Sequence, residues 1–167
     1  DHRAMDHQSR RLRGVGELPE AIDRVVSLAR LREAGVTRGR RRAHVTAERL
    51  RHLPHRGVVL DHGPLVGDAA WRAALLHVGT SARLGGVTAL QASGLNGFEG
   101  TAIHIWATKS TRKGRPPGVV LHESRRWGDD DAAPHGIPRA RPAVAAVQAA
   151  LWARTPRQAA YLLVLPV

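Results

Sequence analysis

An arginine-rich segment near residue 40 carries the clearest chemistry in this chain. Arg38, Arg41 and Arg42 follow Gly35 and Thr37 at a spacing that places them along one side of a helix. A guanidinium group donates paired N–H groups to phosphate oxygens or to the edge of a guanine, so a row of them can contact a DNA major groove. The segment therefore predicts a DNA-contacting helix, and a solvated basic helix without a ligand is the alternative.

The residues before this row predict a helix-turn-helix. Gly35 can adopt the positive φ that ends a helix, Val36 is the apolar residue that would hold the turn to a core, and Thr37 is a good N-cap. Further upstream, two β-branched valines precede Ser27. They indicate one helix that ends near Arg24 and a second that opens at Ser27, in place of one continuous helix.

A hairpin is predicted directly after the arginine-rich helix, because two short runs within residues 49–60 flank a Pro-His-Arg-Gly turn. A basic hairpin behind a helix-turn-helix is the layout of a winged helix. Between Thr37 and Arg56 there are seven arginines and one acid, Glu48, so half of the formal net charge of +12 is concentrated here. The predicted DNA contacts are Thr37, Arg38, Arg40, Arg41, Arg42, His44, Arg49, Arg51, His55 and Arg56.

Composition limits the class of protein. The 167 residues suit one ordinary domain or two small ones, and an apolar content of 43% is enough for a core. The positive charge favours an anionic partner: nucleic acid, a membrane surface or an acidic protein. The absence of cysteine excludes disulfides and thiolate chemistry. No apolar run reaches the roughly 20 residues that span a bilayer, so we expect a cytoplasmic protein without a membrane partner.

The expected fold is α+β, with three segments along the chain. Residues 1–17 are expected to be a disordered basic arm, residues 18–61 an N-terminal winged helix-turn-helix, and residues 62–167 a small α/β domain that is truncated at its C-terminus. In this last segment we expect helices over residues 69–78, 87–93, 142–153 and 157–163, a short strand or turn at 80–84, and an antiparallel hairpin of strands 101–107 and 118–123 with a long tip.

Two further charged clusters have side chains that could form a binding site. A basic cluster at the expected hairpin tip is a possible second contact for an anion, and a solvated loop is the alternative; it consists of Lys109, Arg112, Lys113 and Arg115. Asp129–Asp131, with His122, Glu123 and His135 nearby in sequence, has the side chains that a cation site would need. We favour a solvated acidic loop, because consecutive aspartates point in different directions.

No metal site, cofactor or catalytic residue is predicted. His44, His52 and His55 lack a fourth zinc ligand, and no phosphate-binding loop or nucleophile motif occurs. We therefore expect a protein that is not an enzyme.

The order and spacing of several segments resembles the AbiEi-type antitoxin family of actinobacteria, a winged-helix regulator family whose members often carry a Vsr-like endonuclease domain further along the chain. The segments that carry the resemblance are residues 26–37, 56–59, 63–65, 71–76, 86–90, 94–95, 104–105 and 135–138, followed by the Ala-Ala-Leu-Trp helix.

This resemblance implies a winged helix that binds operator DNA and an α/β domain that antagonises a nucleotidyltransferase-like toxin, as in a type IV toxin–antitoxin system. The chain departs from the family at residues 144–148, where an Arg-Thr-x-x-Asp pattern is replaced by apolar residues and a glutamine. The endonuclease segment is also absent from these residues. Two other functions stay open: the DNA-guiding region of a Vsr-like endonuclease, and a general module for RNA or phosphate.

Overall fold

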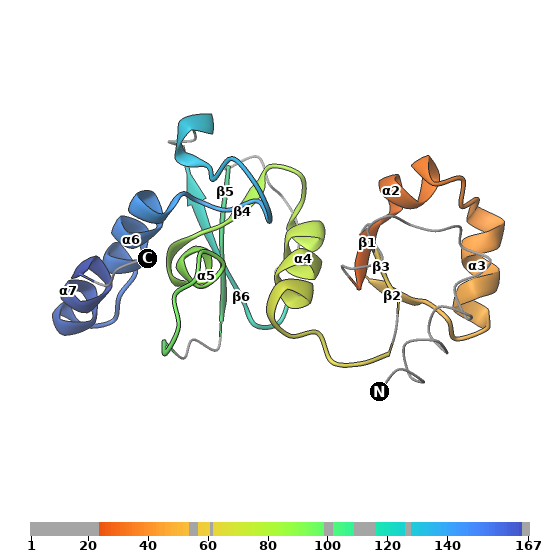
Figure 1. The fold of residues 1–167 in the computed structure, drawn as a ribbon, viewed down its shortest axis with the longest axis horizontal. Coiled ribbons are helices and arrows are strands. Elements are labelled where there is room, and N and C mark those ends of the chain that lie inside the picture. The colour runs from red at the N-terminus through yellow and green to blue at the C-terminus, as the bar shows by residue number, and fades with distance from the viewer. Residues whose placement is uncertain are drawn as a thin grey trace. The chain divides into compact units, whose positions relative to one another are not determined.

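The computed structural model describes residues 24–53, 57–60, 62–98, 102–108, 116–125 and 128–164 (Figure 1). Within these ranges the chain is a mixed α+β protein with six α-helices, one short 3-10 helix and two three-stranded sheets. It divides into two compact units between His77 and Val78, and each is described here by itself. No helix in the described ranges is long and apolar enough to cross a membrane.

The first unit combines a small antiparallel sheet with a pair of helices. Its sheet has the order β1-β3-β2, and Val58 of β3 is paired with Val26 on one side and His52 on the other. The elements are β1 (Val25–Ser27), α2 (Leu28–Glu33), α3 (Arg38–Thr46), β2 (Arg51–Leu53), β3 (Gly57–Val59) and α4 (Gly67–Val78), whose last residue belongs to the second unit.

One apolar cluster joins the sheet to the helix pair. It draws buried side chains from β1, α2, the turn before α3, the segment after α3, and β3, and Leu28 and Val45 pack against it. Removing these side chains from water is the main force that holds α2 and α3 to the sheet. The cluster consists of Val26, Leu31, Val36, Leu50, Val58 and Leu60.

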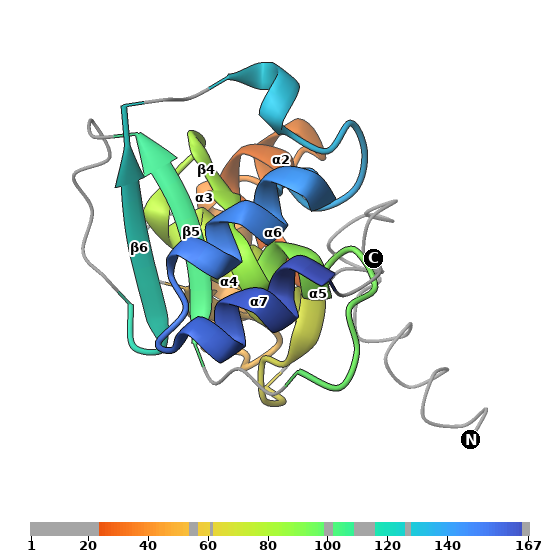
Figure 2. The same cartoon turned by 90° about the vertical axis from the view of Figure 1, so that its left-hand side faces the viewer.

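The second unit has a mixed sheet of order β4-β5-β6, with α6 and α7 packed against each other over one face of it (Figure 2). Its elements are β4 (Ala82–Leu84), α5 (Gly86–Gln91), β5 (Ile103–Thr108), β6 (Val119–Ser124), the 3-10 helix η1 (Asp129–Asp131), α6 (Pro142–Leu151) and α7 (Pro156–Val164). Two helix starts match the sequence: Pro142 opens α6, and the Thr155 hydroxyl accepts a hydrogen bond from the amide of Gln158 at 3.1 Å.

The predicted antiparallel hairpin in this unit is wrong, because β5 and β6 run parallel. Their register pairs Ile103 with Val119 and Thr108 with Ser124. The ten residues between the two strands can span about 33 Å when extended, whereas a six-residue strand is only about 20 Å long. The connection is therefore long enough to return to the start of β5, and the expected hairpin tip belongs to a crossover between parallel strands.

Candidate nucleic-acid interface

The turn between α2 and α3 is built by local side-chain and backbone contacts. The Ser27 hydroxyl accepts a hydrogen bond from the Arg30 amide at 3.1 Å, and the Thr37 hydroxyl accepts one from the Arg40 amide at 3.3 Å. Gly35 has a φ of +75°, and Val36 is only 2% exposed. The predicted caps, turn glycine and core valine are therefore confirmed. The helix expected to end near Arg24 lies outside the described residues.

The four arginines of α3 differ in their exposure to solvent. Arg38, Arg40 and Arg42 are exposed, and Arg41 is half-buried. Among the described residues, none of these four guanidinium groups is engaged by an acid or a carbonyl, and the first turn of α3 contains no acidic residue. The exposed side of α3 therefore offers charged donors that the fold itself does not use.

His44 lies on the side of α3 that faces away from Arg42. It is 7% exposed, and no hydrogen-bond partner for its Nδ1 atom is found among the described residues. Its neighbour Val45 packs on the core of the unit. Of the predicted DNA contacts on α3, His44 is thus the one that the fold places inside.

The hairpin residues have three different placements. Arg49 is exposed, whereas Arg51 is half-buried and its Nη2 atom donates to the carbonyl of Gly63 at 3.3 Å. That bond ties the hairpin to the chain that follows β3. His55 and Arg56, at the hairpin turn, lie outside the described residues, as do Lys109, Arg112, Lys113 and Arg115 of the second basic cluster.

The acidic run forms η1 and is held by an arginine. Arg83 donates from Nη1 to the carbonyl of Gly128 and from Nη2 to the Asp129 carboxylate, both at 2.8 Å, while the Asp129 side chain stays 98% exposed. Within the described part of the chain, no group of three side chains that could hold a metal ion is found. The aspartates are thus not assembled with His122 or His135 into one site.

Two histidines and a tryptophan of the second unit form a cluster that was not predicted from the sequence. Nδ1 of His104 on β5 lies 2.9 Å from Nε2 of His122 on β6, and the His122 ring stacks on Trp152 with centroids 3.4 Å apart. Both histidines lie on strands that were expected from the sequence. Because the two strands were expected to run antiparallel, the contact between the histidines was not predicted.

Burial makes both imidazoles of this cluster hard to protonate. Desolvation lowers the pKa of His104, and desolvation together with the charge of His104 lowers the pKa of His122 to about 4. Both rings are therefore neutral at pH 7, and one N–H is shared between them. His104 and Trp152 also line a cavity of about 250 Å³, together with apolar side chains and with Arg154 and Gln158.

Comparison of the sequence with protein-family models and with curated proteins finds no match. The exposed arginines of α3 thus stand as the strongest candidate site on geometry alone.

Proposed function

We propose that this protein is a DNA-binding transcriptional regulator whose first unit acts as a winged helix, with α3 in the major groove and the β2–β3 hairpin along the backbone. The single observation that carries the proposal is the exposed, unengaged pair of Arg38 and Arg42, one turn apart on a helix capped by Thr37. A short helix that presents guanidinium groups from a rigid turn is a common solution for reading duplex DNA.

The resemblance to AbiEi-type antitoxins extends this proposal. On that basis the second unit would oppose a nucleotidyltransferase-like toxin, and the protein would act in the cytoplasm. This part rests on the order of sequence segments, and the DNA-binding proposal does not depend on it.

Fluorescence anisotropy of a labelled duplex tests the DNA-binding proposal directly. If three phosphates are neutralised, raising the salt from about 50 to about 200 mM should weaken binding about 40-fold. Replacing both Arg38 and Arg42 by alanine should lower the salt exponent by about two. The matched control is Arg154→Ala with Arg157→Ala, which removes the same charge from exposed positions of the second unit. A DNA affinity that does not change with salt concentration, or an equal loss of affinity in both double variants, would contradict the proposal.

Selection from a randomised DNA pool tests whether α3 reads bases. The Arg38 and Arg42 variant should change the preferred sequence, because arginines in the major groove contact guanine edges. Replacing Lys113 and Arg115 by alanine should leave the preferred sequence unchanged. If only the Lys113 and Arg115 variant changed the preferred sequence, the second basic cluster and not α3 would be the part that recognises bases.

A further inference from the structure

Helix α7 carries large apolar side chains both on its buried side and on its exposed surface. Leu162 is buried beneath it, while Tyr161, Leu163 and Val164 are more than half exposed. A surface helix normally turns mainly polar side chains to water, so exposed apolar side chains on a helix need an explanation. Seven large hydrophobic side chains of the described residues are exposed, and five of them lie on α6 and α7. These five are the three on α7 together with Val147 and Leu151 on α6. Such a concentration is typical of an interaction surface.

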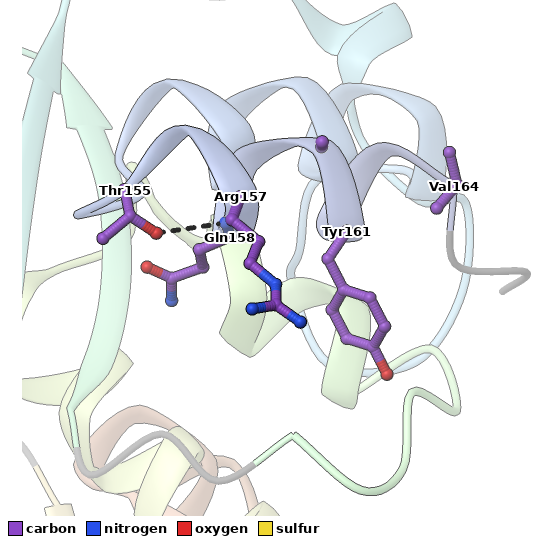
Figure 3. Close-up of a pocket in the computed structure, with 6 residues that line it drawn as sticks. Thr155, Arg157, Gln158, Tyr161 and Val164 are labelled. Atoms are coloured by element: carbon purple, nitrogen blue, oxygen red, sulfur yellow. Dashed lines mark hydrogen bonds between the residues drawn. The ribbon is translucent and has the colours of Figure 1, made fainter.

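The exposed side of α7 forms an open groove (Figure 3). Arg157, Ala160, Tyr161 and Val164 line it at intervals of three and four residues, so they form one stripe about two turns long, which we name the α7 stripe. Figure 3 shows the Arg157 and Tyr161 side chains extending to the same side of the helix. A mainly apolar stripe with this spacing is the kind of surface on which an amphipathic helix docks.

The charge of the chain segment that carries the α7 stripe is of one sign, from residue 132 onward. No aspartate or glutamate follows Asp131 in the sequence, whereas four arginines do, and one of them, Arg157, belongs to the stripe. A second copy of this chain, with a formal net charge of +12, would add like charges to this surface. A complementary partner must therefore be acidic.

We propose that the α7 stripe docks an amphipathic helix of a partner protein, with glutamate or aspartate beside its apolar side. Ala160, Tyr161 and Val164 bury the apolar side of that helix, and Arg157 pairs with one of its acids. Tyr161 is the expected centre of the contact, since tyrosine and arginine are the side chains that most often dominate such interfaces.

Two synthetic helical peptides test the proposal with the full chain. Both carry the same leucine stripe, flanked by glutamate in one peptide and by lysine in the other. Anisotropy of the labelled peptides should show saturable binding of the glutamate peptide only. Tyr161→Asp should weaken this binding about tenfold or more, and Arg157→Gln should weaken it less and reduce its salt dependence.

The matched control is Leu163→Asp, because Leu163 is 56% exposed and Tyr161 53%, but only Tyr161 lines the groove. Leu163→Asp should leave peptide binding unchanged, with circular dichroism showing that both variants stay folded. Equal binding of the two peptides, or equal losses in the two variants, would overturn the proposal. A dimer in sedimentation that Tyr161→Asp abolishes, or binding to phosphatidylserine vesicles that it abolishes, would overturn it as well.

Discussion

Glu48 combines two features at the end of α3. It is the one acid between Thr37 and Arg56, and it is the one non-glycine residue with a positive φ, +51°, among the described residues. Its amide donates to the carbonyl of Val45, and its own carbonyl accepts from Nε2 of His62 at 2.8 Å. The helix thus ends through a left-handed residue, a position that usually carries glycine.

Glu48→Gly should stabilise the protein by about 1 kcal/mol, because the left-handed strain removed exceeds the entropy that glycine adds. Glu48→Gln should leave the unfolding free energy nearly unchanged. Both variants should tighten DNA binding equally, since each removes the same negative charge from the arginine-rich surface. Urea unfolding and DNA anisotropy measure the two effects. If Glu48→Gln stabilised the protein as much as Glu48→Gly, the negative charge at the C-terminal end of α3, and not backbone strain, would be the cause.

His122 should make the stability depend on pH. Its pKa is about 4 in the folded protein, below the ordinary value of 6.5 in the unfolded chain, so the unfolded chain binds more protons between these values. Stability should therefore fall as the pH is lowered from 7 toward 4.5. His122→Phe keeps an aromatic ring on Trp152 and removes the titrating group.

Thermal unfolding at pH 7.5, 6 and 5 checks this expectation. The midpoint of the original protein should drop more steeply with acid than that of His122→Phe. His52→Ala, at an exposed position of the hairpin, should keep the original slope. Parallel slopes for all three proteins would show that the half-buried histidine pair is not the cause.

At the scale of elements, the features that depend on neighbouring residues were predictable from the sequence. Helix caps at Ser27 and Thr37 and the turn at Gly35 were identified, because each depends on a residue type within a few positions. The β2–β3 hairpin was identified by the same local reasoning. These elements carry most of the proposed DNA-binding site.

Features that depend on distant parts of the chain were missed. β1 was not expected, since its three residues form a strand only by pairing with β3 more than thirty residues later. The direction of β6 and the burial of His44 likewise follow from tertiary packing, which overrides local pattern. The histidine pair of the second unit was missed for the same reason.

Gly86 illustrates how tightly α5 packs on the end of α6. Its φ is +50°, and a Cβ atom there would lie 2.7 Å from Cε3 of Trp152. Gly86→Ala should therefore destabilise the protein by about 2–4 kcal/mol, from overpacking and backbone strain together. Gly118→Ala is the control, since Gly118 has a φ of +76° with open space around it and should show the strain alone. Urea unfolding compares the two. Equal losses would mean that the contact with Trp152 contributes nothing.

At the scale of the whole molecule, the described residues contain no group of three side chains that could hold a metal ion, and we expect the protein to bind nucleic acid without metal-dependent cleavage. Purified protein incubated with plasmid DNA or RNA and Mg²⁺ or Mn²⁺ should leave both intact on a gel, because the Asp129 carboxylate is engaged by Arg83. Cleavage that disappears when Asp129, Asp130 and Asp131 are changed to asparagine would contradict this expectation. It would also make η1 a metal-dependent site.

Ser27 has a consequence for how such a protein can evolve. It closes β1 opposite Gly57, and its hydroxyl also caps α2. Few residues satisfy both requirements: valine or isoleucine would keep the strand and lose the cap, while aspartate or asparagine would do the reverse. Only serine and threonine suit both, so this position should tolerate little change during divergence. The exposed arginines of α3 make no such contacts with other described residues, so substitutions there can change what the surface binds without disturbing the turn and caps that present it.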